Sequence, residues 1–475
     1  MSSRLTGAFG SHRCGGAQPG VRDGRPGTAV AVQRQRSRSP GCHRTLHCES
    51  LPFLLVAPSE PTPAGHLPLT AMDTALASLS MTALLVFDHP IDQPAETILQ
   101  ALSRALVPYY PIAGRLAAGA AIACTGEGVA FVAARASCTL REARLADGSP
   151  AVAVEELALS FAGQHAGDPP LLLMQVTEFS CGGFVVGVTW DHAVADGVGM
   201  AQFLQAVGEL ARGLPSPGVA PLRTDGLLPE LPPPIISMTR SLVANPHSEF
   251  PSTYITVPLS FINRVKSEFQ RSLNNGDNTA APAPPCSAFE VFTAAIWKCR
   301  ARATISGAAD EASPTALVFT ANARKQAAAR DGYYGNLFTF GLAVATLGEV
   351  ANADVLDLVK LIKDAKARVP HTFADGAAYV AGEMGGRLRG LRPYDTLYVT
   401  SWWNLGFDDV DFGGGGGAVR VMGDMERKVV PACILCGRKD KADGVAAMAL
   451  CVKEDHKEAF QAELRRLVRR DVAID

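Results

Sequence analysis

Residues 184–199 read Phe-Val-Val-Gly-Val-Thr-Trp-Asp-His-Ala-Val-Ala-Asp-Gly-Val-Gly, and this stretch decides the fold that we predict. Its first part, 184–190, is almost entirely apolar, which is typical of a strand buried on both faces. The strand ends at Asp191, His192 and Asp196, and the glycines beside them let the backbone turn tightly. Binding sites usually lie where polar groups follow a buried strand. We therefore predict a functional site at His192.

Secondary-structure signals on both sides of this stretch predict an α/β fold. Apolar residues alternate with polar ones over 172–176, and a turn at 180–183 leads back into the buried strand, so the two strands form a hairpin. Apolar residues then recur at helical spacing over 200–211, and Gly213 ends this helix.

The rest of the chain alternates strands and helices in the same way. One helix opens at Pro94 and stops at Pro108, and Ser287 with Glu290 forms a capping box at the start of another. We expect further strands at 253–257, 315–321, 338–346, 396–402 and 446–453, and helices at 259–273, 287–302, 351–368 and 456–469. Two α/β halves of similar size, each a sheet with helices, fit this order better than one large domain.

Composition divides the chain into four regions. Residues 1–48 are rich in Arg, Gly, Ser and Gln without apolar periodicity, so we expect a disordered extension, with organelle targeting as the alternative. Residues 214–235 are rich in proline and should link an N-terminal domain, 49–213, to a C-terminal domain, 236–475. A polar, proline-rich loop over 274–285 is expected to be mobile and exposed.

Charge and cysteine content exclude several classes of protein. The 475 residues include 44 Lys and Arg against 46 Asp and Glu, a formal net charge of -2 that offers nucleic acid or an anionic membrane no general attraction. No run approaches the roughly 18 apolar residues that span a bilayer. Eleven scattered cysteines are typical of reduced thiols rather than of a disulfide framework. We therefore expect a soluble, cytoplasmic protein that binds neither nucleic acid nor membrane.

Three roles are open for His192 on residue chemistry alone. Imidazole is the side chain whose proton affinity suits a general base at neutral pH. A metal site with Asp196 would need a third ligand, and the chain has no His-rich partner segment. A hydrogen-bonded structural role is the commoner fate of a lone histidine.

Other motifs carry less weight. Gly197 and Gly199 begin a dinucleotide-binding pattern, but Gln202 occupies its third glycine position. No G-x-S-x-G elbow and no GK[ST] phosphate loop occurs in the sequence. The cysteine pair of 433–436 encloses apolar residues and is read as buried strand, and the glycine run 413–417 is read as a flexible turn.

Several motifs together resemble those of the plant CoA-dependent BAHD acyltransferases. His-Ala-Val-Ala-Asp-Gly at 192–197 resembles their H-x-x-x-D-G motif, and Asp-Phe-Gly-Gly-Gly at 411–415 resembles their D-F-G-W-G motif, at a similar separation. Further stretches similar to the family occur in the same order, namely 61–63 with 69–73, 110–116, 322–324 and 334–336. The resemblance extends from about residue 51 to the C-terminus.

This resemblance implies a monomer of two chloramphenicol-acetyltransferase-like domains, each a mixed sheet with helices, with a channel between them. Acyl-CoA would enter as co-substrate from one face and a small-molecule alcohol or amine from the other, with no bound cofactor or metal. His192 would remove the acceptor's proton and pass it to the leaving thiolate, without an acyl-enzyme. The acyl group is expected to be aromatic, benzoyl or hydroxycinnamoyl, with acetyl as the alternative.

The resemblance also assigns roles around His192. Trp402 would donate its indole N–H to the oxyanion of the tetrahedral intermediate, with Thr400 nearby, although Trp402 would also serve simply as packing. Asp196 would not touch the imidazole but would pair with Arg324 and hold the loop that carries His192.

More distant positions are given supporting roles. Ser287 matches a family position close to CoA, although helix capping alone explains it. Asp411, Phe412 and Gly413 are expected to be structural. Gly414 replaces the tryptophan of the family motif, so we expect a looser loop there, with Trp403 as a partial substitute.

Two alternative functions remain. A peptide-synthetase condensation domain shares the H-x-x-x-D-G core, but it usually carries a second histidine where this chain has Asp191. A catalytically silent protein of the same fold would bind acyl-CoA without turnover.

Overall fold

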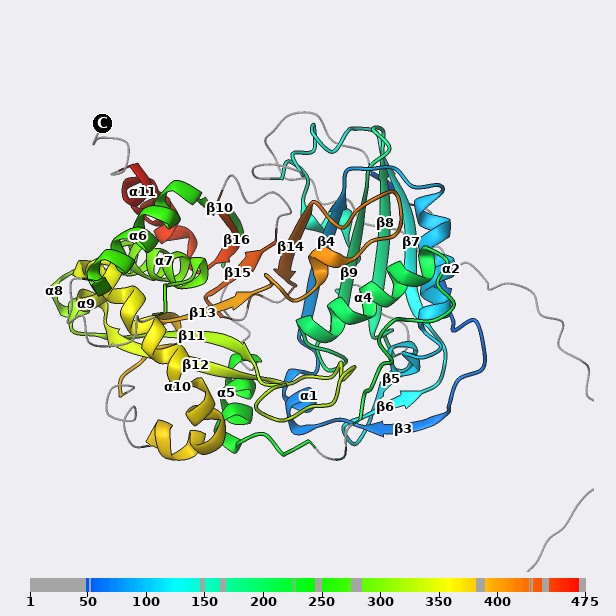
Figure 1. The fold of residues 1–475 in the computed structure, drawn as a ribbon, viewed down its shortest axis with the longest axis horizontal. Coiled ribbons are helices and arrows are strands. Elements are labelled where there is room, and N and C mark those ends of the chain that lie inside the picture. The colour runs from blue at the N-terminus through cyan, green and yellow to red at the C-terminus, as the bar shows by residue number, and fades with distance from the viewer. Residues whose placement is uncertain are drawn as a thin grey trace, which may run out of the picture.

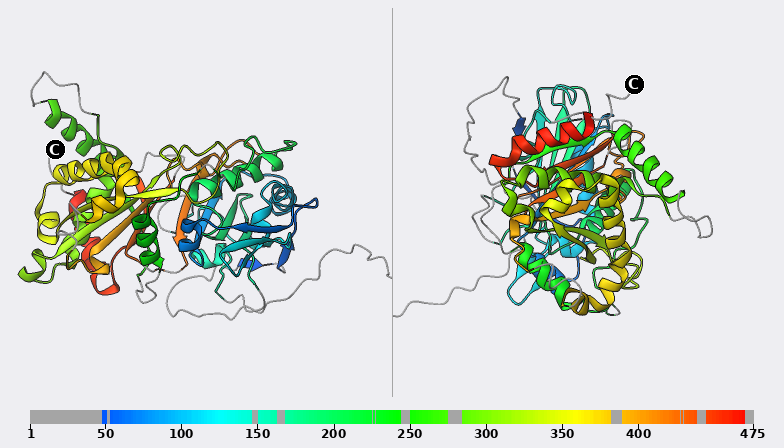
Figure 2. Two further views of the ribbon diagram at one scale, coloured as in Figure 1. Left: turned by 90° about the horizontal axis from the view of Figure 1, so that it is seen from below. Right: turned by 90° about the vertical axis from the view of Figure 1, so that its left-hand side faces the viewer.

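The computed structural model describes residues 48–469 except 51–52, 146–149, 163–167, 225, 227, 244–249, 275–283, 382–388, 427, 429 and 438–443. The chain forms two lobes, each with a sheet covered by helices (Figures 1 and 2). The predicted N-terminal extension and most of the predicted loop at 274–285 lie outside the described residues. The two α/β halves are confirmed.

The first lobe is built on a mixed sheet of seven strands in the order β1-β7-β8-β9-β4-β14, with β2 also paired to β7. Its strands are β1 (Cys48–Ser50), β2 (Leu54–Val56), β4 (Ser80–Phe87), β7 (Val129–Ala136), β8 (Leu172–Phe179), β9 (Phe184–Asp191) and β14 (Arg420–Met425). A small sheet beside it contains β3 (Gly65–Pro68), β6 (Ala121–Cys124) and β5 (Arg115–Ala117). The predicted hairpin is confirmed, because β8 and β9 pair antiparallel and seven of the eight residues of β9 are buried.

The second lobe contains a mixed six-stranded sheet in the order β10-β16-β15-β13-β11-β12. Its strands are β10 (Thr253–Val257), β11 (Pro314–Asn322), β12 (Phe338–Thr346), β13 (Thr396–Ser401), β15 (Ala432–Cys436) and β16 (Val445–Leu450). Each strand predicted in this half is present within a few residues of its expected bounds. Both cysteines of 433–436 are buried in β15, as predicted.

Helices cover the sheets according to their apolar faces. In the first lobe, α2 (Pro94–Ala105) and α4 (Gly197–Ala211) bury Ile98 and Phe203 against the sheet. In the second, one sheet face packs against α6 (Leu259–Asn274), α7 (Ala288–Thr304), α9 (Leu347–Asn352), α10 (Val355–Ala381) and α11 (Glu454–Arg469). Two short helices lie in different lobes: α3 (Val154–Leu157) packs against β8 and β9 of the first sheet, and α8 (Ala308–Glu311) packs beside α9. No helix in the described part of the chain is long and apolar enough to cross a membrane.

The helix expected at 351–368 is wrong in its bounds. The chain forms α9 and α10 instead, and the break falls at Ala353, whose amide donates to the carbonyl of Glu349 as α9 ends. Lys298 of α7 donates to the main-chain oxygens of Ala351 and Ala353, so the carbonyls at the end of α9 are satisfied from outside the helix.

The two lobes share elements across the predicted boundary. The helix α1 (Ala71–Leu76), from the first half, packs with α5 (Pro233–Val243) against the second sheet through Leu76, Ile236 and Val318. The predicted linker also ends earlier than expected, because α5 already begins at Pro233, a residue that suits the first turn of a helix.

Strand β14 crosses in the opposite direction. It follows β13 of the second sheet but pairs antiparallel with β4 at the edge of the first, with Gly423 opposite Ala83 (Figure 1). It also stays close to the second sheet, where Val421 donates its amide to the carbonyl of Gly437. The division into 49–213 and 236–475 therefore does not describe two sheets of consecutive sequence.

Asp424 lies on β14, and the burial of its carboxyl makes the stability of the protein depend on pH. Burial raises the pKa of its carboxyl to about 6, so between about pH 4 and 6 the unfolded chain loses a proton that the folded chain keeps. Stability therefore falls as the pH rises through this window, by on the order of 3 kcal/mol. Asp424→Asn is expected to raise the Tm at pH 7.5 but not at pH 4, measured by calorimetry. Asp409→Asn, at an exposed position, is the control. An equal gain in Tm from both variants would contradict this account.

Candidate active site

The predicted site forms where β9 passes into α4. Asp196 is the N-cap of α4, and its Oδ1 accepts a hydrogen bond from the amide of Gly199 at 3.0 Å. A β-carbon at Gly199 would lie 1.8 Å from the main-chain oxygen of Tyr334, so this turn requires glycine. The indole N–H of Trp190 donates to the carbonyl of Ala195 and closes the loop. The backbone around His192 is therefore held on both sides.

Asp191, the residue before the histidine, braces the same loop. Its carboxylate accepts hydrogen bonds from the amides of Ala193 at 2.8 Å and Ser78 at 3.0 Å. Burial nevertheless raises its pKa, against the effect of these two bonds. Asp191 therefore stabilises the loop's conformation, at the position where condensation domains usually carry their second histidine.

The tautomer of His192 is set by Asn336. Nδ2 of Asn336 donates to Oδ1 of Asp73 at 2.8 Å and to the main-chain oxygen of His192 at 2.7 Å. Its Oδ1 therefore faces Nδ1 of His192, at 2.9 Å. An amide oxygen only accepts, so Nδ1 carries the proton of the neutral ring. Nε2 is left with its lone pair and has no hydrogen-bond partner among the described residues.

Asp196 and Arg324 form the ion pair that the resemblance implied. The guanidinium binds both carboxylate oxygens, each at 2.9 Å, and both side chains are largely buried. Arg324 also donates to the carbonyls of Tyr333 and Gly335, and Oδ2 of Asp196 accepts from the amide of Leu337. This bidentate pair ties the loop of His192 to the segment that carries Asn336.

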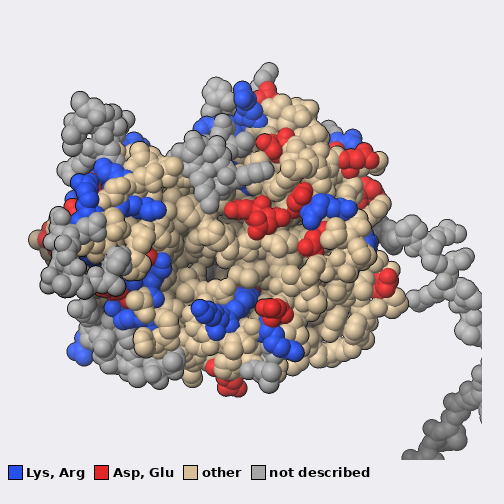
Figure 3. Space-filling view, in the orientation of Figure 1, with Lys and Arg blue, Asp and Glu red and all other residues tan. Residues whose placement is uncertain are grey.

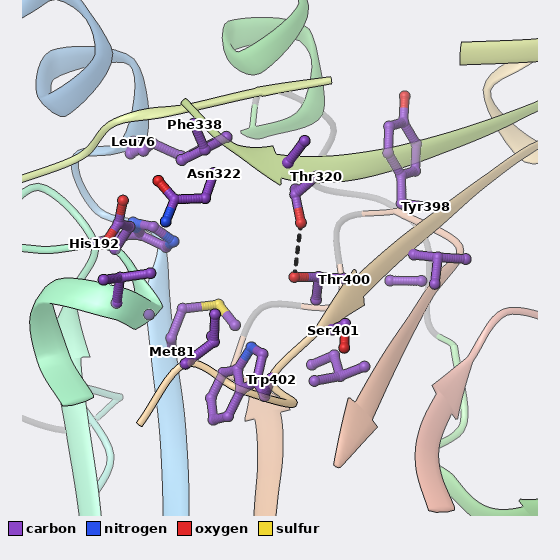
Figure 4. Close-up of a pocket in the computed structure, with 18 of the residues that line it drawn as sticks. Leu76, Met81, His192, Thr320, Asn322, Phe338, Tyr398, Thr400, Ser401 and Trp402 are labelled. Atoms are coloured by element: carbon purple, nitrogen blue, oxygen red, sulfur yellow. Dashed lines mark hydrogen bonds between the residues drawn. The ribbon is translucent and has the colours of Figure 1, made fainter. Parts of the chain in front are cut away.

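A cavity of about 210 Å³ lies beside His192, between the first lobe and the second sheet. Most of its wall is apolar, with Met81, Phe338, Tyr398 and Trp402 among the lining side chains, as Figure 4 shows. The space-filling view shows a hollow between the two lobes (Figure 3). His192 thus faces a space that both halves of the chain enclose.

Thr400 and Trp402, the residues expected near the oxyanion, also line this cavity. The hydroxyl of Thr320 donates to Oγ1 of Thr400 at 3.0 Å, which leaves the proton of Thr400 free for another acceptor (Figure 4). The indole of Trp402 stacks on Phe407, and its N–H has no hydrogen-bond partner among the described residues. Both residues therefore bring unused donors to the cavity that contains His192.

The remaining predicted residues lie elsewhere. Ser287 caps α7 in the predicted box with Glu290 and is not among the residues that line the cavity. Asp411 pairs with Arg212 at the end of α4, at 3.5 Å. Phe412 packs edge-on against Phe87. Gly413 accepts a hydrogen bond from Nε2 of His89 at its carbonyl, taking the ring N–H as the donor. These four residues therefore make structural contacts and do not line the cavity.

Gly414 has no room for the tryptophan of the family motif. Its φ is +84°, and a β-carbon there would lie 2.7 Å from Cδ2 of His89 and 2.8 Å from the carbonyl oxygen of Pro90. Trp403 does not take its place, because its indole N–H donates to the carbonyl of Cys436 and its ring packs on the second sheet. The loop is therefore arranged around glycine.

Alanine substitutions separate crowding from backbone strain in this loop. Gly415 also has a positive φ, +106°, but a β-carbon there would meet nothing within 4 Å. We expect Gly415→Ala to lower the free energy of unfolding by about 1–2 kcal/mol through φ alone. Gly414→Ala should cost more, because His89 and Pro90 must also move. Urea unfolding of the two variants measures the difference, and equal losses would show that the contacts at Gly414 are easily relieved.

Three site residues escaped the sequence analysis. Asp73 and Asn336 lay in stretches that resemble the family, but no role followed from them, and Thr320 carried no signal beyond its place in a strand. Asp73 showed one recognisable signal, because with Thr70 it has the spacing of a capping box, which α1 indeed has. That signal places Asp73 on a helix but says nothing of its contact with Asn336.

A profile described as the Transferase family matches residues 50–467. Rice Acyl transferase 15 (Oryza sativa subsp. japonica) is 40% identical over 442 residues, covering 87% of this chain and 97% of that protein. The chain belongs to this family, the plant BAHD acyltransferases. The acyltransferase is also 31% identical to benzyl alcohol O-benzoyltransferase of Petunia hybrida over 452 residues, which cover 89% of this chain and 94% of that protein.

Solved structures share the fold of the acyltransferase. Vinorine synthase superposes with a TM-score of 0.67 at 23% identity, covering 89% of this chain and 98% of that one. TRI101 of F. sporotrichioides, complexed with coenzyme A and T-2, gives a TM-score of 0.61 at 16% identity over 84% of this chain and 97% of that one. At these identities the likeness concerns the fold, and it confirms the predicted two-domain acyltransferase architecture.

Proposed function

We propose that the acyltransferase moves an acyl group from acyl-CoA to a hydroxyl or amine of a small plant metabolite, with His192 as general base. The observation that carries this proposal is the free Nε2 of His192, fixed by Asn336 and facing an apolar cavity between the lobes. An alcohol is a poor nucleophile until its proton is removed, and a neutral imidazole with an open Nε2 accepts that proton at neutral pH.

The chemistry balances without a covalent enzyme intermediate. As the acceptor's proton passes to Nε2, its oxygen or nitrogen forms a bond to the thioester carbonyl carbon. Thr400 and Trp402, whose O–H and N–H are unused, would donate hydrogen bonds to the oxyanion that develops. The C–S bond then breaks, and His192 returns the proton to the thiolate of CoA. A partly enclosed apolar cavity limits competing hydrolysis.

An aromatic acyl group fits the cavity best. Its volume of about 210 Å³ exceeds the ~150 Å³ of a protein cavity that holds benzene. Phe338, Tyr398 and Met425 present apolar surface to it. Arg324 lines the cavity too, but Asp196 occupies its guanidinium, which argues against a carboxylated acyl group such as malonyl. The benzoyl group in the name of the Petunia relative supports the same class.

Acyl-CoA as the donor is supported by the TRI101 complex with coenzyme A. Figure 3 shows Lys and Arg side chains near the hollow between the lobes, where they would favour the phosphates of CoA.

We further propose that the enzyme acts as a monomer in the cytoplasm. A cavity enclosed within one chain supports the first point, and eight described cysteines that form no disulfide support the second.

A panel of acyl donors and acceptors tests this function. Purified protein is incubated with benzoyl-, p-coumaroyl-, acetyl- and malonyl-CoA, each with aromatic alcohols, aliphatic alcohols and amines, and products are detected by mass spectrometry. We expect release of free CoA that depends on the acceptor, fastest with the aromatic donors. Acyl-CoA binding in a calorimeter without product from any pair would favour a catalytically silent protein. Preference for malonyl-CoA would contradict the aromatic assignment.

A further inference from the structure

Arg223 lies in the segment between α4 and α5 that the sequence marked as a linker. This segment is fastened to the site: the amide of Leu222 donates to the carbonyl of Gly332 at 2.8 Å, and the amide of Tyr334 donates to the carbonyl of Leu222 at 3.0 Å. The side chain of Arg223 is 4% exposed. The segment that connects the lobes therefore places the buried cation of Arg223 beside the loop of His192.

The guanidinium of Arg223 has two partners, one on α1 and one in that loop. Its Nη2 lies 2.9 Å from Oδ2 of Asp73 and 3.0 Å from the main-chain oxygen of Ala193. Burial disfavours the charge of Arg223, but the nearby carboxylate of Asp73 and the tyrosines Tyr333 and Tyr334 leave its pKa raised. Arg223 therefore keeps its positive charge in the folded protein.

Asp73 passes the effect of this ion pair to Asn336. Its side chain is fully buried; Oδ2 accepts from Arg223 and from the amide of Thr70, the latter at 2.9 Å, and Oδ1 accepts from Asn336. The two hydrogens on Nδ2 of Asn336 are thus committed to Asp73 and to the carbonyl of His192. This commitment turns Oδ1 of Asn336 toward the imidazole and keeps the proton on Nδ1 of His192.

We propose that Arg223 is a positioning residue that, through Asp73 and Asn336, holds His192 in the tautomer with a free Nε2. The inference rests on the proposed function, because the tautomer matters only if His192 is the base. Arg223 acts at a distance from the substrate, so its loss should lower kcat and leave the KM for acyl-CoA nearly unchanged.

The test compares Arg223→Met with Arg223→Lys. Met keeps much of the volume without the charge, whereas Lys keeps a cation that reaches either Asp73 or Ala193. We expect kcat to fall by about 10-fold or more in Arg223→Met, the loss typical of an outer-shell partner, and to recover in part in Arg223→Lys. NMR of protein labelled with ¹⁵N in histidine reads the tautomer directly. It should show Nδ1–H for His192 in the wild type and a mixture in Arg223→Met.

A double variant separates positioning from stability. Asp73→Asn with Arg223→Met leaves no unpaired buried charge, so it should be more stable than Arg223→Met alone, yet kcat should remain low. An unchanged tautomer and kcat in either folded Met variant would overturn the inference. Activity that survives in a His192 variant would instead overturn the proposed function, so the two failures are distinguishable.

Discussion

Replacing His192 by alanine is expected to lower kcat by about 10²- to 10⁴-fold, the range that a general base contributes. The substitution removes the Nε2 lone pair that would accept the acceptor's proton, and nothing in the ion pair of Asp196 with Arg324 replaces it. Release of free CoA from an aromatic acyl-CoA, followed with a thiol reagent at saturating acceptor, measures the loss.

The matching control is His66→Ala. His66 is exposed on β3, so its replacement should leave kcat unchanged. Calorimetry with the acyl-CoA should give similar affinity for the His192 variant and the wild type, because the base touches the acceptor rather than the thioester's carrier. Undiminished turnover in the His192 variant would remove it from the mechanism.

The elements around His192 could be predicted because their signals are local. The apolar run of β9 and the turn residues after it stand next to one another in the sequence. The capping box at Ser287 is equally short-range. Each of these patterns fixes a backbone conformation without knowledge of the rest of the chain.

The resemblance implied the pair of Asp196 with Arg324, but the other supporting contacts could not be predicted because they join remote segments. Asn336 lies 144 residues from His192 and 263 from Asp73, and no periodicity or spacing connects such positions. Strand β14 is a similar case, since 346 residues separate Ser80 and Glu426, whose side chains meet at 2.6 Å where β4 and β14 lie together. Buried pairing partners are chosen by tertiary packing, so the sequence marked His192, Thr400 and Trp402 at the cavity but gave no role to Asn336 or Asp73.

Breaking the ion pair of Asp196 and Arg324 should have the largest effect on stability. In Arg324→Met, a buried carboxylate loses its bidentate partner, and we expect the free energy of unfolding to fall by about 3–5 kcal/mol. The carbonyls of Tyr333 and Gly335 lose a donor in the same change. Urea unfolding followed by tryptophan fluorescence measures the loss. Lys360→Met is the control, because the pair of Lys360 with Asp357 is more than half exposed and should contribute less than about 1 kcal/mol.

Removing both charges tells whether the pair supplies stability or geometry. Asp196→Asn with Arg324→Met leaves no unpaired buried charge, so part of the lost stability should return. Asn still caps α4 through Gly199, but it no longer joins that helix to the segment of Asn336. If the pair positions the loop, kcat should stay low in this variant even at temperatures where it is fully folded. Recovery of kcat together with stability would show that Arg324 serves only to neutralise Asp196, and that the loop of His192 is held by its own turn.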